Sequence, residues 1–169
     1  MTADFEPAEG GCTCGHVRYR MGSAPLVVHC CHCRWCQRET GTAFALNAVI
    51  EADRVDLVAG EVEDVLTPTL SGNGQIITRC PKCRIALWSS YTMGGLREKI
   101  RFIRVGSLDD PDRLPPDVHI FTSTKQPWIA LSDDVPVMAE FYPRKEIWQQ
   151  ASLDRLAAAF EKAGIRPPG

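Results

Sequence analysis

The sequence predicts a mainly β protein made of antiparallel strands, with one helix at its C-terminal end. Short segments rich in Val, Ile, Thr, Phe, Trp and Tyr recur over the first two-thirds of the chain, as expected of strands. Gly, Ser and Asn clusters separate these segments, as expected of turns. Near the C-terminus the spacing of apolar residues changes to a helical period. The length of 169 residues suits one domain.

The strands are expected in one central domain. Residues 1–9 are acidic and are expected to form a flexible tail, residues 10–145 the β domain, and residues 146–169 the C-terminal helix and tail. The expected strands are 16–21, 26–30, 43–50, 55–59, 62–67, 75–79, 85–91, 100–105 and 118–123. Asn73-Gly74 predicts a hairpin turn, because both residues tolerate positive φ. The proline-containing segment 124–145 is expected to be irregular.

The C-terminal helix is predicted from a repeat of apolar residues. Leu153, Leu156 and Phe160 recur at helical spacing. Ser152 is a candidate N-cap and Gly164 a candidate C-terminal stop. We expect this helix to pack on the sheet or on a partner, so an oligomer is left open.

Composition and charge exclude several classes of protein. Hydrophobic residues make up 44% of the chain and charged residues 24%, which is too apolar for disorder. A formal net charge of −2 gives no reason to expect nucleic acid or an anionic membrane as a partner. No apolar run reaches the ~18 residues of a membrane span, and the first residues do not resemble a signal peptide. We therefore expect a cytoplasmic protein.

The eight cysteines fall into three groups that have the spacing of metal ligands. The groups are Cys12-Thr13-Cys14, Cys30-Cys31-His32-Cys33-Arg34-Trp35-Cys36 and Cys80-Pro81-Lys82-Cys83. A Cys-x-x-Cys turn presents two sulfurs to one ion, so Cys80 and Cys83 need a second pair of ligands. Cys12 and Cys14 can supply that pair, which predicts a closed four-cysteine zinc site of the structural kind.

The middle group has a different geometry. Cys31, Cys33 and Cys36 can form a three-sulfur site by themselves, and three ligands with an open position are typical of catalytic zinc. Cys30 points away from Cys31 in an extended strand, so we expect it to be a buried thiol. The alternatives are four disulfides, a thioredoxin-like redox pair, two purely structural metals, and iron in place of zinc.

Around these cysteines the chain resembles the glutathione-dependent formaldehyde-activating enzyme family, which includes centromere-protein-V-like proteins. The matching stretches are residues 10–19, 31–44 and 79–83, with a weaker match at 119–123 and 127–128. Order, spacing and flanking residues agree over roughly residues 10–140. The resemblance implies a β-tent fold, in which two layers of antiparallel strands are pinned near one end by zinc.

The resemblance also implies an activity and two zinc ions per chain. The residues that it implies as ligands of a structural zinc are Cys12, Cys14, Cys80 and Cys83. Those that it implies as ligands of a catalytic zinc are Cys31, Cys33 and Cys36. The family activity is that of S-(hydroxymethyl)glutathione synthase, a carbon–sulfur lyase, so the implied partner is a small glutathione-like thiol or its aldehyde adduct. The alternatives are a non-catalytic zinc-stabilised β-tent binding module and a thiol redox enzyme.

The chain departs from the family pattern at Arg84, where the family usually has Gly after the second Cys-x-x-Cys. A positive φ at Arg84 costs about 1 kcal/mol. A structural zinc worth roughly 10–16 kcal/mol tolerates that cost. No glutathione-binding residue can be mapped onto the sequence.

Side chains near the middle group have two interpretations. Arg34 and Arg38 can receive an anionic substrate or simply offset thiolate charge. His32 is expected to point away from the metal, and His119 has a structural role at least as readily as a catalytic one. The aromatic residues expected in the core are Trp35, Phe44 and Trp128. The basic stretch of Lys99, Arg101 and Arg104 is expected to be a solvated strand edge.

Overall fold

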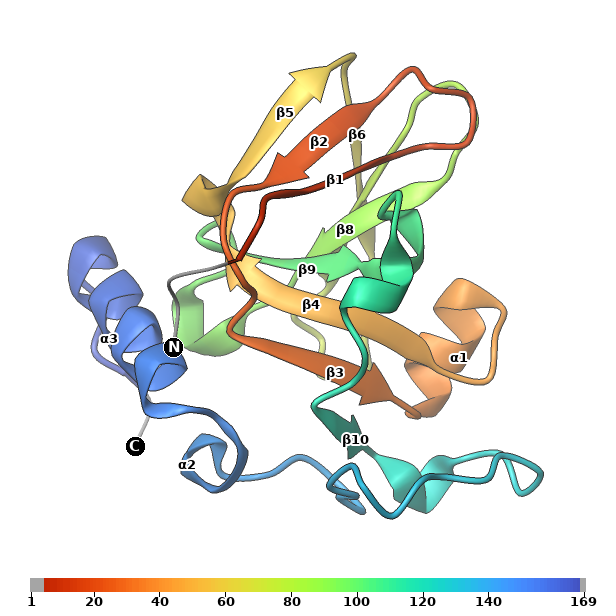
Figure 1. Cartoon of the computed structure of the whole chain (residues 1–169), viewed down its shortest axis with the longest axis vertical. Helices are drawn as coiled ribbons and strands as arrows, with labels where there is room; N and C mark the ends of the chain where they lie inside the picture. Colours follow the sequence, from red (N-terminus) through yellow and green to blue (C-terminus); the bar gives the residue numbers. More distant parts are fainter. Residues whose placement is uncertain (1–4, 168–169) are drawn as a thin grey trace.

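The computed structural model describes residues 5–167, which form ten strands in two sheets. The three-stranded sheet has the order β1 (Ala8–Gly11), β2 (Arg18–Met21), β5 (Val55–Ala59). The seven-stranded sheet has the order β10 (Val118–Ile120), β3 (Val27–Cys31), β4 (Ala45–Glu51), β9 (Ile100–Arg104), β8 (Ala86–Ser90), β7 (Gln75–Arg79), β6 (Glu63–Thr67). Figure 1 shows the smaller sheet above the larger one. This is the mainly β architecture that the sequence predicted.

Strand pairing is antiparallel except at one edge. β10 runs parallel to β3, so the larger sheet is mixed rather than purely antiparallel. The predicted strands are present, and β5 and β7 have the predicted bounds. Strand β1 begins at Ala8, inside the segment expected to be a tail, and pairs with β2 from Ala8↔Met21 onward.

The predicted hairpin forms, but its turn differs from the expected one. β6 and β7 pair from Thr67↔Gln75, so a loop of several residues joins them rather than two residues. Gly72 and Gly74 carry the positive φ angles, of 77° and 68°, whereas Asn73 has none. The left-handed positions of this loop are therefore the two glycines and not an Asn-Gly pair.

The core has two parts, one on each face of the larger sheet. Between the sheets, Tyr19 and Trp88 make an edge-to-face pair with ring centroids 5.6 Å apart. On the opposite face, Val49 packs with Leu156 and Phe160 of helix α3 (Gln150–Ala163). Successive residues of a strand face opposite sides, so β3 and β4 are buried on both faces.

The helices cover the ends and the outer face of the larger sheet. Helix α1 (Arg34–Thr40) follows β3, and the short α2 (Arg144–Ile147) precedes α3 (Figure 1). Helix α3 ends at Gly164, with φ 66° as predicted, but its N-cap is Gln149, because the helix starts before Ser152. In the part of the chain that the structure describes, no helix combines the length and apolarity needed to cross a membrane.

Candidate metal centres and the adjoining pocket

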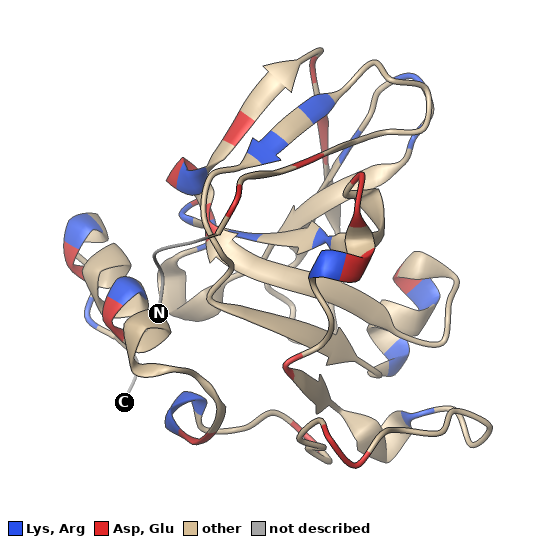
Figure 2. Ribbon diagram, viewed as in Figure 1, with Lys and Arg blue, Asp and Glu red and all other residues tan. Residues whose placement is uncertain are grey.

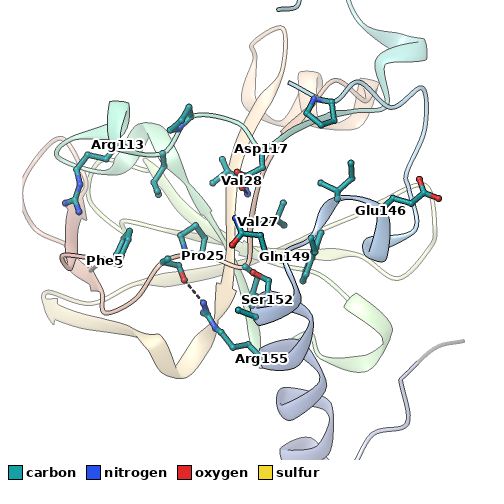
Figure 3. Close-up of a pocket in the computed structure, with 18 of the residues that line it drawn as sticks. Phe5, Pro25, Val27, Val28, Arg113, Asp117, Glu146, Gln149, Ser152 and Arg155 are labelled. Carbon is teal, nitrogen blue, oxygen red and sulfur yellow. Dashed lines mark hydrogen bonds between the residues drawn. The ribbon is translucent and has the colours of Figure 1, made fainter. Parts of the chain in front are cut away.

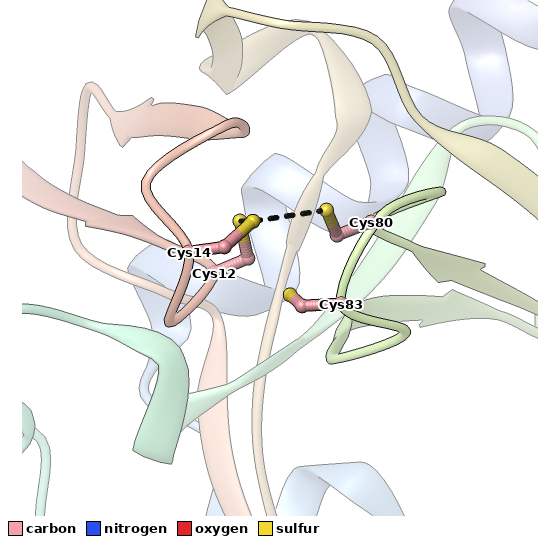
Figure 4. Close-up of side chains that lie close together, drawn as sticks. All are labelled: Cys12, Cys14, Cys80 and Cys83. Carbon is pink, nitrogen blue, oxygen red and sulfur yellow. Dashed lines mark hydrogen bonds between the residues drawn. The ribbon is translucent and has the colours of Figure 1, made fainter.

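Four cysteines from the two sheets meet in one group. Cys12 and Cys14 lie in the loop between β1 and β2, and Cys80 and Cys83 lie in the loop between β7 and β8 (Figure 4). All four sulfurs lie within 4.8 Å of one another. The Sγ of Cys14 is 3.5 Å from that of Cys12 and 3.7 Å from that of Cys80. These four residues could hold a metal ion, and such an ion would link the smaller sheet to the larger one.

The thiols of this group are perturbed in opposite directions: the His16 amide acts to lower the pKa of Cys14, but the neighbouring cysteines outweigh it and raise that pKa to about 11, whereas the pKa of Cys12 is lowered. The amide of Val17 donates to the Sγ of Cys12 at 3.3 Å. Burial acts to raise the pKa of the Cys12 thiol, but this amide and the neighbouring cysteines outweigh burial and lower the pKa to about 6. Arg84, the departure from the family pattern, does have a positive φ, of 65°. Its side chain forms an ion pair with Glu63.

A second group of three cysteines lies where β3 meets helix α1. Cys31 is the last residue of β3, Cys33 caps the helix and Cys36 is in its first turn; their sulfurs lie within 4.8 Å of one another. The Cys36 amide donates to the Sγ of Cys33 at 3.3 Å. Hydrogen bonds from the Cys31 and Cys36 thiols lower the pKa of Cys33 to about 2. The same contacts raise the pKa of Cys31 to about 12 and also raise that of Cys36, so one thiolate forms readily, whereas three would need a bound cation. The group could hold such a cation. We call these three residues the tripod.

Glu39 fixes helix α1 on the sheet. Its carboxylate accepts from Arg79 of β7 at 2.8 Å and from Arg104 of β9 at 2.5 Å.

Arg101, also on β9, lies with its guanidinium 4.6 Å from the centroid of the Trp88 ring. The expectation of a solvated edge was wrong, because β9 lies inside the sheet between β4 and β8. Figure 2 shows acidic and basic residues interspersed along the described chain.

A pocket of about 720 Å³ adjoins the tripod. Its apolar lining comes from Tyr91, Met93, Phe102, Ile120, Phe121 and Phe141. Its polar and charged lining includes Arg34, Asn47, Glu140 and Arg144. A mostly apolar cavity with a few convergent polar groups is the usual form of a small-molecule site. Because Cys33 and Cys36 are only partly buried, the tripod is open toward this pocket.

The side chains near the tripod that the sequence singled out differ in whether they line the pocket. Both arginines are exposed on α1, but Arg34 lines the pocket and Arg38 does not. Trp35 lines the pocket and its Nε1 donates to the Pro68 carbonyl at 2.8 Å. Phe44 and Trp128 are 38% and 72% exposed, so the expectation of core aromatics was wrong. Sequence reasoning missed Phe141 and Arg144, since no local motif marks a segment so distant in sequence from the tripod.

The remaining cysteine belongs to a buried group beside the tripod. The Sγ of Cys30 lies 3.6 Å from Nε2 of His32, and that nitrogen lies 3.0 Å from Nδ1 of His119. Burial raises the pKa of the Cys30 thiol to about 12, so the thiol is neutral. The group has the donor atoms for a metal ion, but the hydrogen bond between the imidazoles accounts for the contact. His32 thus faces away from the tripod, as expected.

A second cavity, of about 710 Å³, lies between the first turn of α3 and strand β3. Figure 3 shows Arg113, Asp117, Ser152 and Arg155 around it. No cysteine is among the described residues that line it. The pocket beside the tripod is therefore the better candidate for a reaction site.

The fold and these cysteine groups define a mainly β protein with two candidate metal centres, one of them facing a pocket. The glutathione-dependent formaldehyde-activating enzyme family matches residues 7–124, and the chain belongs to this family. A curated protein of Halomonas elongata, named provisionally as such an enzyme, is 27% identical over 127 residues, which cover 73% of this chain and 80% of the relative. A solved Rhodobacter sphaeroides protein is 18% identical, with a TM-score of 0.42 over 60% of this chain and 87% of that chain. A likeness this weak carries no functional argument.

Proposed function

We propose that the protein is a zinc-dependent carbon–sulfur lyase that acts on a small thiol–aldehyde adduct, as S-(hydroxymethyl)glutathione synthase does. The observation that carries the proposal is the position of the tripod. Three sulfurs within 4.8 Å of one another lie at the wall of a pocket of about 720 Å³. Family membership and the Halomonas relative support a glutathione-like partner.

The donor sets of the two groups fit zinc in different roles. Four thiolates with the spacing of Cys12, Cys14, Cys80 and Cys83 suit a closed structural site. Three thiolates facing a pocket suit a site with an open position. Zinc bound there would lower the pKa of a thiol and polarise a carbonyl group. Since ligand thiolates must stay reduced, we also propose a reducing compartment, the cytoplasm.

The proposed reaction joins a thiol to formaldehyde. The sulfur forms a bond to the carbonyl carbon, and the thiol proton ends on the carbonyl oxygen, which gives a hydroxymethyl thioether; the reverse reaction breaks the same bond. The side chains of Phe102, Phe121 and Phe141 give the pocket an apolar wall beside the reacting atoms. Cys33, held at the start of α1, keeps the tripod sulfurs at the pocket wall. The chain therefore supplies positioning of the thiol and the aldehyde.

The test compares two cysteine variants in the zinc-loaded protein. Cys33→Ser should abolish the conversion of glutathione and formaldehyde to the adduct, while the circular dichroism spectrum stays that of the wild type. Cys30→Ala, which alters the neighbouring buried thiol, should keep the activity. Full activity of Cys33→Ser would contradict the proposal. A wild type that binds thiols without converting them would favour the non-catalytic binding module.

A further inference from the structure

The guanidinium of Arg144 lines the tripod pocket without an oxygen partner. Its Nε is shielded from solvent and has no hydrogen-bond partner among the described residues. The one hydrogen bond found for the side chain joins an Nη nitrogen to the Sδ of Met93 at 3.7 Å. A thioether is a weak acceptor, whereas a guanidinium has five N–H donors. Arg144 is partly exposed and its guanidinium lies 6.0 Å from the centroid of the Trp148 ring, but its shielded Nε–H donor is unused.

Two other arginines without a carboxylate partner donate to backbone carbonyls. Arg101 donates to the backbone carbonyl of Val55 at 2.9 Å, and Arg113 donates to that of Glu6 at 2.7 Å. In the ion pairs found within residues 5–167, Arg144 takes no part. A shielded N–H donor without an acceptor is costly, so the Nε of Arg144 points to an acceptor that comes from outside the chain.

Buried aromatic residues on either side hold Arg144 in position. Trp148 donates from Nε1 to the hydroxyl of Tyr142 at 2.8 Å, and that hydroxyl lies 2.7 Å from Nε2 of His29. His29 precedes Cys31 by two positions on β3, so both side chains point to the same face and both line the pocket. The segment that carries Arg144 is thereby tied to the strand that carries the tripod.

Apart from the tripod sulfurs, the charged residues that line the pocket include a cation that is available to an anionic guest. Arg34 and Arg144 are cations, and Glu140 is the anion among the described lining residues. Arg34 already donates to Oε1 of Gln37 at 2.8 Å, and Glu140 accepts from Ser123 at 2.6 Å. Arg144 is thus the lining cation that lacks an oxygen acceptor. It also lies beyond residue 124, where the family match ends, so the family match does not supply it.

We propose that Arg144 binds a carboxylate of the thiol substrate and makes the tripod pocket selective for carboxylate-bearing thiols over neutral ones. The inference rests on the proposed function, since it takes the tripod as the place where the thiol reacts. A planar guanidinium matches a carboxylate with two parallel hydrogen bonds, and such charge-assisted bonds are strong in an apolar site.

The test measures adduct formation from formaldehyde with two thiols, glutathione and the neutral 2-mercaptoethanol. Arg144→Gln should raise KM for glutathione about 10- to 100-fold and leave kcat within about twofold. Its KM for 2-mercaptoethanol should stay within about twofold of the wild-type value. Arg144→Lys keeps the charge but loses the planar guanidinium, so its KM for glutathione should lie between those of the wild type and Arg144→Gln. Lys145→Gln, an equal charge change at the neighbouring exposed residue, should match the wild type for both thiols.

Equal losses for both thiols, or an unchanged KM for glutathione, would overturn the role of Arg144. Calorimetric titration with S-methylglutathione, which keeps the carboxylates but has no free thiol, separates this result from failure of the proposed function. If no variant forms adducts, weaker binding of S-methylglutathione to Arg144→Gln than to Lys145→Gln still supports the carboxylate site. Equal binding by the two variants overturns it.

Discussion

The carboxylate of Glu39 holds helix α1, and with it Cys33 and Cys36, against the larger sheet. The Glu39 side chain is 6% exposed, and its partners Arg104 and Arg79 are 11% and 28% exposed. Removing one partner of a buried ion pair costs about 3–5 kcal/mol, because the other charge stays buried without compensation. Glu39→Gln keeps the volume and one acceptor oxygen. We therefore expect a loss of about 3 kcal/mol in the free energy of unfolding, or roughly a 100-fold change in the folded-to-unfolded ratio.

Urea unfolding at constant zinc concentration measures this loss. The matched control is Asp53→Asn, since Asp53 pairs with Lys162 at 2.6 Å while the two side chains are 60% and 76% exposed. An exposed pair is worth about 0–1 kcal/mol. Loosening α1 should also let a chelator remove metal faster from the tripod than from the four-cysteine group. A loss in Glu39→Gln no larger than that in Asp53→Asn would refute the view that Glu39 fixes the helix.

Three further changes test the metal groups, the helix packing and an acid whose pKa is raised. Cys80→Ser should lose one metal ion per chain and unfold or aggregate, because metal binding energy is folding energy. The control Cys30→Ala should keep its full metal content. Equal metal content in the two variants would contradict this prediction. Phe160→Ala, at a side chain that is 2% exposed, should lower the free energy of unfolding by about 3–5 kcal/mol, and a urea midpoint close to the wild-type value would show that α3 does not pack as described. Burial raises the pKa of Asp117, so its contribution to stability is complete below the unfolded-state pKa and is lost as pH rises through the folded-state pKa. Asp117→Asn can still accept a hydrogen bond from the Val28 amide, so it should gain stability relative to the wild type as pH rises above about 4. If the free energies of unfolding of variant and wild type, measured in urea, differ by the same amount from pH 4 to 8, the pKa of Asp117 is not raised.

The sequence was sufficient where structure depends on neighbours along the chain. The bounds of β5 and β7, and the end of α3 at Gly164, follow from local alternation, helical spacing and the tolerance of glycine for positive φ. The division of the cysteines into a group of four and a group of three also follows from spacing, and the sulfur positions agree with it. Local signals did not predict helix α1. There Cys33 caps the helix and Glu39 anchors it by ion pairs to two strands.

The sequence by itself determined the fold class, the family resemblance and the seven cysteines that meet in the two groups. Each of these depends on residue types at short, regular intervals, which local geometry converts directly into structure. Only the tertiary structure decided that the four-cysteine group lies between two different sheets, and that the tripod faces a pocket. It also brought Arg144 to that pocket, through the contact of Tyr142 with His29. Such long-range contacts depend on how buried faces pack together, and no interval along the sequence encodes them.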